Sequence, residues 1–201
     1  MRRIVLIDGE NFLYCLRMLA GQSGKLLERD GLHDYAIRDL LNEVIGEGDS
    51  SEMFYYGAKL REYTETEKLA EKSKAAIKFQ LKLSNSLNKQ NIIFVKVGHL
   101  RAREGEICAS CKHQSWKLIE KGVDVGLAVR MLTEARKGVE IVLVSSDTDL
   151  LPAVHEASRR GANIIFVGHE AQPILSLIKA ADSHRVITAT LVKKHMFKNG
   201  D

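Results

Sequence analysis

The sequence predicts an α/β domain in which a mainly parallel central sheet lies between two layers of helices, a three-layer α/β/α sandwich. Short β-branched runs alternate with longer segments of helical periodicity, which is typical of βαβ units with parallel strands. Several of the runs are continuously apolar, as in strands that are covered on both faces. The length of 201 residues fits one domain.

The expected elements follow in an order that right-handed crossovers can connect. We expect strands at residues 3–7, 52–56, 92–97, 140–144 and 163–167, and a short edge strand at residues 185–187. We expect helices at residues 11–19, 34–46, 66–87, 121–136, 150–160 and 172–181. Residues 98–116 are too many for an ordinary connection. We therefore expect a hairpin or an active-site flap there, inserted in a single domain that spans residues 1–201.

Apolar patterns justify the individual elements in chain order. The first strand contains the run IVLI, and the strands at residues 140–144 and 163–167 contain IVLV and IIFV. The helix at residues 66–87 separates its leucines from its lysines, as an amphipathic helix does. The helix at residues 121–136 carries an apolar stripe that includes Leu127, Ala128 and Met131.

Composition excludes several classes of protein. Apolar residues make up 45% and charged residues 28%, as in ordinary globular proteins. No apolar run approaches the ~20 residues of a membrane span, and the run at residues 4–7 is too short for a signal peptide. The three cysteines, an odd number, argue against a disulfide framework and favour a reducing cytoplasm. The net charge of +4 permits a nucleic-acid partner.

Carboxylates follow two of the expected strands at the point where each strand ends. Asp8 comes directly after the first strand, and Asp147 and Asp149 follow the strand at residues 140–144. Ligands of an open parallel sheet bind beyond the carboxyl ends of its strands, so we expect these side chains to meet at one edge. Clustered carboxylates repel one another, and a bound divalent cation relieves the repulsion. Oxygen ligands of this kind suit Mg²⁺ or Mn²⁺.

Helix capping is the alternative explanation for each acid. Asp8 and Asp147 precede expected helices, where Asp is a favoured N-cap. Asp124 lies in the first turn of an apolar helix, where Asp also stabilises a helix start. It shares the apolar stripe with Leu127 and Met131, however, and a carboxylate buried there without a partner is costly. The three acids together favour one common site.

Five segments form an ordered set of motifs along nearly the whole chain. They are IDGEN near the N-terminus, KGVDVGLAVRML in the middle, VSSDTDLLPAV downstream of it, GANIIFVG at residues 161–168 and SLIKAADSHRVI at residues 176–187. Together they resemble the motifs of the NYN domain family, the LabA-like branch of the PIN-like nuclease fold. The resemblance implies a PIN-like sandwich of Rossmann-like topology, with an acidic, metal-binding pocket and ribonuclease-type activity.

The resemblance also assigns positions to the acidic site. The matching residues are Asp8, Asn11, Asp124, Asp147 and Asp149. Ser146 departs from the family pattern, because many members have Gly before the first Asp of this pair. We expect its hydroxymethyl group to crowd the pocket slightly without removing a ligand.

These observations favour a metal-dependent nuclease, and first among these an endoribonuclease, with RNA as the expected substrate and DNA left open. Mg²⁺ or Mn²⁺ held by the acids would activate water and neutralise charge on the phosphate. We expect Asp8 and Asp147 to bind the metal directly, and Asp124 to bind it or to orient the attacking water. Asp149 is expected to bind the metal or to support a ligand, and Asn11 to be a carbonyl ligand or a substrate donor.

Other function classes compete with this interpretation. A non-catalytic NYN module could bind nucleic acid or protein, although retention of every acid favours the enzyme. A phosphatase or Toprim-like phosphotransfer enzyme fits poorly, because the first motif lacks Asp-x-Asp. The motifs GxSxG, Walker A, GxGxxG and HExxH do not occur in the sequence, so the common triad, nucleotide-binding and zinc-protease classes are not supported. The oligomeric state stays open, a homodimer included.

The helix at residues 66–87 carries five lysines within an arc of ~160°. We expect Lys74, Lys78 and Lys82 to bind the phosphates of nucleic acid. The alternative is an ordinary solvated face, because glutamates nearby dilute the charge. Four aromatic residues could stack on bases; they are Trp116, Tyr55, Tyr56 and Tyr63. Tyr55 and Tyr56 lie in an expected strand, however, so we expect at least one of them to be a core residue.

A short cysteine motif lies within the expected hairpin. Cys108, Cys111 and His113 could bind a structural zinc ion, with His99 as a fourth ligand from the facing strand. Reduced structural thiols are the alternative, because a second half of the motif is missing. Cys15 is expected to be a small buried apolar residue.

Overall fold

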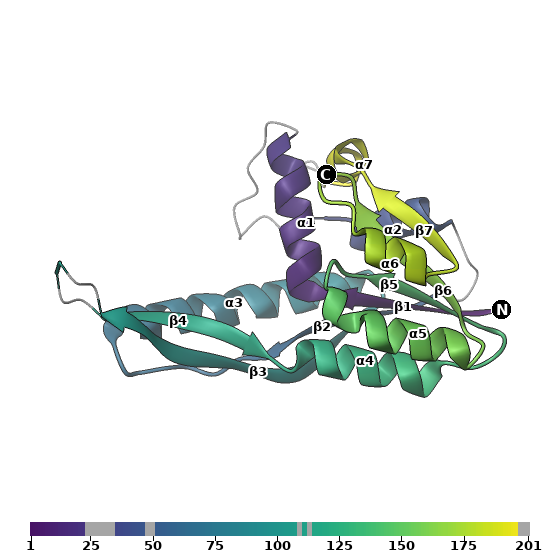
Figure 1. The fold of residues 1–201 in the computed structure, drawn as a ribbon. Coiled ribbons are helices and arrows are strands. Elements are labelled where there is room, and N and C mark those ends of the chain that lie inside the picture. Colours follow the sequence, from purple (N-terminus) through teal and green to yellow (C-terminus); the bar gives the residue numbers. More distant parts are fainter. Residues whose placement is uncertain (23–34, 47–50, 108–109, 112–113, 197–201) are drawn as a thin grey trace.

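The computed structural model describes residues 1–22, 35–46, 51–107, 110–111 and 114–196 (Figure 1). Within these residues a seven-stranded sheet has the order β4-β3-β2-β1-β5-β6-β7. The strands are β1 (Arg2–Asp8), β2 (Ser51–Lys59), β3 (Ile92–Ile107), β4 (Gln114–Lys121), β5 (Val139–Val144), β6 (Asn163–His169) and β7 (Ser183–Ile187). The helices are α1 (Gly9–Gln22), α2 (Ile37–Ile45), α3 (Glu67–Lys89), α4 (Val123–Glu134), α5 (Leu151–Arg159), α6 (Leu175–Ala180) and α7 (Ala189–Lys194), with a 3₁₀ turn, η2, at Thr148–Leu150.

The sheet is parallel except at one edge. β1 lies at its centre and pairs in parallel with β2 and with β5. The pairs β2–β3, β5–β6 and β6–β7 are also parallel, whereas β3 and β4 are antiparallel. The mainly parallel α/β architecture expected from the sequence is confirmed.

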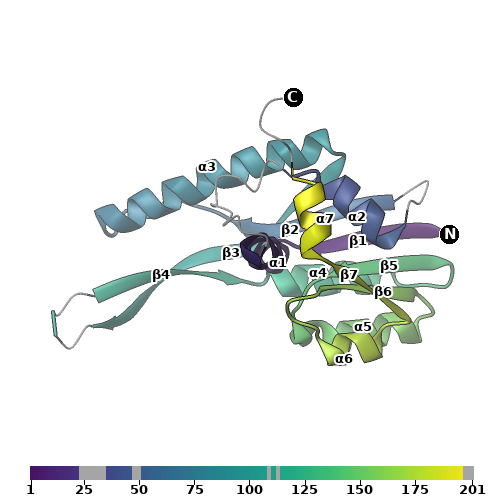
Figure 2. The ribbon, with the colours of Figure 1, turned by 90° about the horizontal axis from the view of Figure 1, so that it is seen from above.

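Two apolar cores lie on the two faces of this sheet. Helices α1, α2, α3 and α7 pack on one face, against side chains that include Ile7 and Val144. Helices α4, α5 and α6 pack on the other, against side chains that include Leu6 and Leu143 (Figure 2). All four apolar residues from Ile4 to Ile7 are fully buried, and each such side chain contributes about 1.5–3 kcal/mol. Helices on both faces explain why this strand has no polar side.

An antiparallel arm projects from the β4 edge of the sheet (Figure 1). β3 pairs with β2 only as far as the Lys59–His99 pair. Beyond that point β3 pairs with β4, from His99–Lys121 to Ile107–Gln114. We call the paired residues 99–107 and 114–121 the arm. It lies where the sequence predicts a hairpin or flap, and it continues beyond Trp116 to Lys121.

Glycine is required where the arm joins the sheet. Gly98 has a φ of +60°, and a Cβ atom there would lie 2.2 Å from the carbonyl oxygen of Lys121. Such an approach is closer than any side chain allows, and left-handed backbone favours glycine. The base of the arm is therefore packed directly against the residues that lead into α4.

Two observed elements are not among those expected from the sequence, namely β4 and α7. β4 has the sequence QSWKLIEK, in which no apolar run marks a strand, and antiparallel pairing with β3 holds it in place. In the part of the chain that the structure describes, no helix has both the length and the apolar character needed to cross a membrane.

Candidate metal and active site

Asp8 occupies the carboxyl end of the central strand and is buried, with 5% of its surface exposed. Its Oδ2 atom accepts hydrogen bonds from Nδ2 of Asn11 at 2.8 Å and from Oγ of Ser145 at 2.9 Å. Its Oδ1 atom accepts the backbone N–H of Asn11 at 3.3 Å. The carboxylate therefore caps the start of α1, as one interpretation of the sequence expects, while it also faces the end of β5.

A second acid is tied to Asp8 through one hydroxyl group. The Oγ atom of Ser145 accepts the backbone N–H of Asp147 at 3.1 Å. Oδ1 of Asp147 accepts the backbone N–H of Asp149 at 2.9 Å and so caps the η2 turn. The parallel register that pairs Ile7 with Val144 places these segments side by side. The structure thus brings Asp8, Asn11 and Asp147 together, with Asp149 next to them and exposed.

The negative charges at this edge repel one another. Burial raises the pKa of Asp8, and the negative charge of Asp147 raises it further. The hydrogen bonds from Ser145 and Asn11 act in the opposite direction, because they stabilise the carboxylate. Asp8 is therefore a buried acid that binds protons more readily than an exposed one.

Asp124 lies in the first turn of α4 and is half-buried. The N-cap residue of this helix is Gly122, with a φ of +84° and no side-chain capping bond. Capping of α4 by a side chain, the alternative interpretation, therefore does not occur at the N-cap position. Asp124 is close enough to Glu120 for its negative charge to help raise the pKa of Glu120.

Two glutamates that the sequence analysis did not select belong to the same edge. Burial raises the pKa of Glu120 to about 7, and the charges of Glu10, Asp8 and Asp124 add to this effect. Glu120 is the penultimate residue of β4 and directly precedes the KGVD segment, and Glu10 lies within the DGEN segment. Their places next to the motifs were the available signals. We call the six carboxylates together the acid edge; they are Asp8, Glu10, Glu120, Asp124, Asp147 and Asp149.

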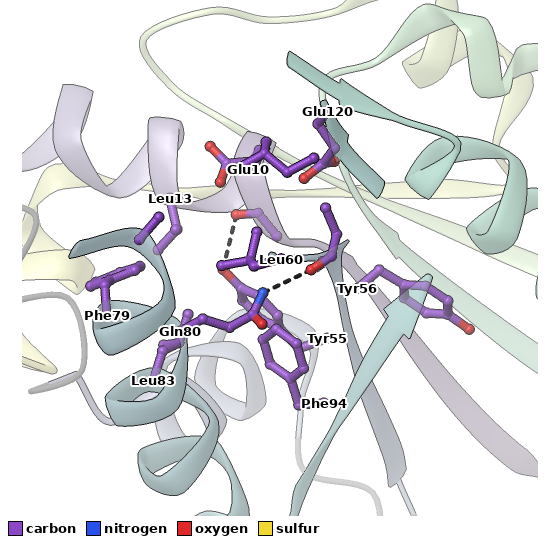
Figure 3. Close-up of a pocket in the computed structure, with 15 residues that line it drawn as sticks. Glu10, Leu13, Tyr55, Tyr56, Leu60, Phe79, Gln80, Leu83, Phe94 and Glu120 are labelled. Carbon is purple, nitrogen blue, oxygen red and sulfur yellow. Dashed lines mark hydrogen bonds between the residues drawn. The ribbon is translucent and has the colours of Figure 1, made fainter. Parts of the chain in front are cut away.

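A mainly apolar pocket of about 60 Å³ lies under part of the acid edge. Figure 3 shows Glu10 and Glu120 together at one end of it, with Phe94 and Leu83 toward the other. The hydroxyl of Tyr55 donates to the carbonyl oxygen of Gly9 at 3.0 Å, which ties the pocket floor to the start of α1. The low polarity of this floor explains why Glu120 binds a proton so readily.

His169 borders the site from the end of β6. It is 3% exposed, and neither ring nitrogen has a hydrogen-bond partner among the described residues. Burial lowers its pKa, so the ring is neutral at pH 7. With Asn11 and Ser145 it lines a cavity of about 10 Å³, which is close to the volume that one water molecule needs.

The donor set of the acid edge suits a hard divalent cation. Among the described residues, none of the six carboxylates forms an ion pair with a lysine, arginine or histidine. Carboxylates that repel one another without a cationic partner are stabilised by Mg²⁺ or Mn²⁺. In the described part of the chain, however, no three or more His, Cys, Asp or Glu residues are already placed to hold a metal ion. A common site at Asp8, Asp124 and Asp147 thus stays a prediction.

The lysine face of α3 has the expected exposure. Lys74, Lys78 and Lys82 are exposed, while Leu69 and Leu83 are buried on the opposite side of the helix. The expectation that tyrosines stack on bases is wrong for three of them, because Tyr55, Tyr56 and Tyr63 are all buried. Their rings fill the cores and contacts around β2, so a base cannot reach them.

The zinc prediction is partly outside the described residues, since these include neither Cys108 nor His113. Cys111 is exposed and carries a free thiol. His99 pairs with Lys121 at the base of the arm, about eight residues or roughly 26 Å of strand from Ile107. The expectation that His99 completes a site with Cys111 is therefore wrong. Cys15 is buried as expected, and burial raises the pKa of its thiol to about 12.

Comparisons with known proteins found one matching family and similar solved structures. The family model of the NYN domain matches residues 2–188, whereas a search of curated proteins found no match. A crystal structure of a protein of unknown function from Vibrio parahaemolyticus is similar, with a TM-score of 0.57 and 14% identity over 92% of each chain. A mutant of phosphofructokinase-2 from Escherichia coli matches 86% of this chain and 54% of its own at 12% identity, with a TM-score of 0.39. At these identities the first structure supports the fold alone.

Proposed function

The chain belongs to the NYN domain family, and from this premise we propose that it is a metal-dependent endoribonuclease. Membership places it among proteins with a PIN-like nuclease fold. The proposed reaction is hydrolysis of phosphodiester bonds in RNA, with Mg²⁺ or Mn²⁺ held by Asp8, Asp124 and Asp147.

One observation carries the proposal: six carboxylates gather at the carboxyl edge of the sheet, and none of them has a cationic partner among the described residues. Carboxylates with a purely structural role would be paired with cationic side chains or hydrated. Here burial raises the pKa of both Asp8 and Glu120. The protein keeps an unfavourable concentration of negative charge where parallel sheets bind their ligands.

The residues of the acid edge have distinct proposed roles. When bound, the metal would lower the pKa of a water molecule and neutralise charge on the phosphate. Ser145 and Asn11 hold Asp8 in place through their hydrogen bonds. Glu120 has a pKa of about 7, which suits a group that accepts and returns a proton near neutral pH. Asp149, exposed beside Asp147, is proposed to orient the substrate or a ligand.

A non-catalytic nucleic-acid-binding module is the second candidate. The observation that favours it is the absence, among the described residues, of three acidic, histidine or cysteine side chains already placed around a metal. In this alternative the acid edge would bind a cation weakly or not at all, and RNA would be bound without being cut.

Cleavage of labelled single-stranded RNA distinguishes the two candidates. The wild type is expected to cut the strand with Mn²⁺ and to leave it intact with a chelator. Asp147→Asn is expected to fold normally, because Asn is as good an N-cap as Asp, yet to lose cleavage. Asp39→Asn, at an exposed position of α2 next to Arg38, which hydrogen-bonds Gln90 ahead of β3, is the matched control. If the RNA stays intact with every metal tested, the nuclease proposal is wrong and the binding module takes its place.

A further inference from the structure

The two faces of the arm differ in chemistry. His99, Arg101 and Arg103 alternate along β3, so their side chains share one face. Their partners on β4 are Lys121, Ile119 and Lys117, and directly opposed residues point to the same side. We call the five basic residues of this set the basic arm face; they are His99, Arg101, Arg103, Lys117 and Lys121.

The other face of the arm is turned toward the rest of the protein. Leu100 and its partner Glu120 both line the pocket under the acid edge. The hydroxyl of Tyr63 donates to the carbonyl oxygen of Leu100, which further fixes this part of β3. The basic arm face therefore points away from the pocket, and all five of its basic residues are exposed.

The basic arm face carries positive charge that no described acid neutralises. Among the residues that the structure describes, none of its five side chains forms an ion pair with Asp or Glu. Some arginines elsewhere in the described residues do form such pairs. Arg2, for example, contacts Glu52 and Glu134, each at 2.7 Å. Concentrated unpaired positive charge on one face is the electrostatic pattern of a nucleic-acid-binding surface.

Two further basic residues extend this charge into a hollow. Lys59 is the last residue of β2, Arg61 follows two residues later, and both are exposed. With His99 and Arg101 they line an open hollow of about 490 Å³. The guanidinium of Arg61 lies 4.7 Å from the ring centroid of Tyr63, so a buried ring positions this charge.

The base of the basic arm face is close to the acid edge along the chain. Lys121 stands at the base of the arm and is separated from Asp124 by two residues. The close packing of Gly98 on the carbonyl group of Lys121 fixes this junction. Alternate residues along β3 lie roughly 6.6 Å apart, a spacing comparable to that of successive phosphates in an extended strand.

We propose that the basic arm face, with Lys59 and Arg61, binds the phosphate backbone of single-stranded RNA and guides it to the acid edge. The choice of RNA rests on the proposed function, whereas the surface rests on its unpaired charge. Six of these seven residues are lysine or arginine, whose charges contact phosphates, so the contact is largely independent of base sequence.

Binding is measured by fluorescence anisotropy with labelled oligouridylate, in chelator so that no cleavage occurs. The test variant combines Arg101→Gln, Arg103→Gln and Lys117→Gln. Loss of three phosphate contacts is expected to weaken binding roughly tenfold or more and to reduce the salt slope by about 2, at ~0.7 per contact on a single strand. Melting temperatures of variant and wild type are compared to verify that the arm variant folds.

The matched control removes the same charge at the opposite edge of the sheet. It combines Lys179→Gln, Arg185→Gln and Lys193→Gln, all exposed on α6, β7 and α7. Its salt slope is expected to equal that of the wild type. Equal losses in the two variants would show that only net charge matters and would overturn the proposal, as would unchanged binding by the arm variant. Tighter binding of the deoxy strand of the same sequence would overturn the choice of RNA.

Cleavage separates this inference from the proposed function. A dinucleotide is too short to reach the arm, so the arm variant is expected to cut it as the wild type does. RNA binding that depends on the arm, without cleavage by the wild type, would refute the nuclease and keep the surface. Cleavage by the wild type together with arm-independent binding would refute the surface alone.

Discussion

The hydroxyl of Ser145 donates a 2.9 Å hydrogen bond to Oδ2 of Asp8 and so joins the carboxyl ends of β5 and β1. The Oγ atom of Ser145 also accepts a hydrogen bond from the backbone N–H of Asp147, at 3.1 Å. A single buried hydroxyl therefore sets the relative positions of two acids that come from separate strands. Positional control of this kind matters, because neighbouring groups fix the geometry of metal ligands.

Replacement of Ser145 by Ala is expected to disturb the acid edge more than the core. The change leaves the Asp8 carboxylate with one donor fewer, so its pKa rises further above the ordinary value. The free energy of unfolding should fall by about 1–3 kcal/mol, the cost of a lost hydrogen bond to a buried charged group. Denaturant unfolding measures the loss and an NMR titration follows Asp8. Ser146→Ala, which removes no bond to Asp8, should change neither.

The pH dependence of stability should depend on Glu120. Its folded pKa of about 7 lies above the ordinary value of 4.5, so folding favours the protonated form. The contribution of Glu120 to the free energy of unfolding is fully present below about pH 4.5 and is lost as the pH rises through 7. We expect the metal-free protein to lose about 1–2 kcal/mol between about pH 5 and about pH 8, because solvent screens this half-buried group. In Glu120→Gln the dependence should flatten, and a curve as steep as that of the wild type would contradict the assignment.

The junction of the arm should be intolerant of a side chain. Gly98→Ala would place a Cβ atom 2.2 Å from a backbone oxygen at a φ of +60°. We expect a loss of at least about 2 kcal/mol, or a displaced arm. Gly21→Ala is the control, because among the described residues no heavy atom outside its own stretch of helix lies within 4 Å of its Cβ position. That change, within α1, should stabilise the protein by about 0.4–1 kcal/mol. Thermal or denaturant unfolding of both variants tests the contrast.

The lysine face of α3 is expected to add affinity without chemistry. Lys74→Gln, Lys78→Gln and Lys82→Gln together should weaken nucleic-acid binding and flatten its salt dependence, by up to about 0.7 per contacted phosphate. The rate of cleavage at saturating RNA should stay unchanged. If the salt slope does not move, this face is an ordinary solvated surface and the substrate runs along the arm alone.

The central sheet could be predicted from the sequence because its strands carry uninterrupted apolar runs. Ile4–Ile7 is buried on both faces, and such a run has few alternatives to a central parallel strand. Asp8 and Asp147 could be predicted for the same reason, since Asp8 directly follows such a run and Asp147 follows another after two serines. The apolar stripe of the expected helix at residues 121–136 indicated Asp124, and the ordered motifs added Asn11.

The arm strand β4 and its acid Glu120 could not be predicted from apolar runs. β4 contains neither a long apolar run nor a regular alternation of polar and apolar residues. It depends on pairing with β3, a contact that no local pattern records. Glu120 belongs to the acid edge only because that pairing brings it beside Glu10 and Asp8. His169 follows β6 as Asp8 follows β1, yet its burial depends on α1 and β7 around it.

The most direct test of the acid edge is a crystal of the protein soaked in Mn²⁺ and measured for anomalous scattering. We expect one strong peak bounded by the carboxylates of Asp8, Asp124 and Asp147, with metal–oxygen distances of about 2.0–2.6 Å. In Asp147→Asn crystals the same peak should weaken or vanish. Carboxylates that stay more than ~10 Å apart cannot share one ion at such bond lengths. That result, or a Mn²⁺ peak at another place only, would contradict the account.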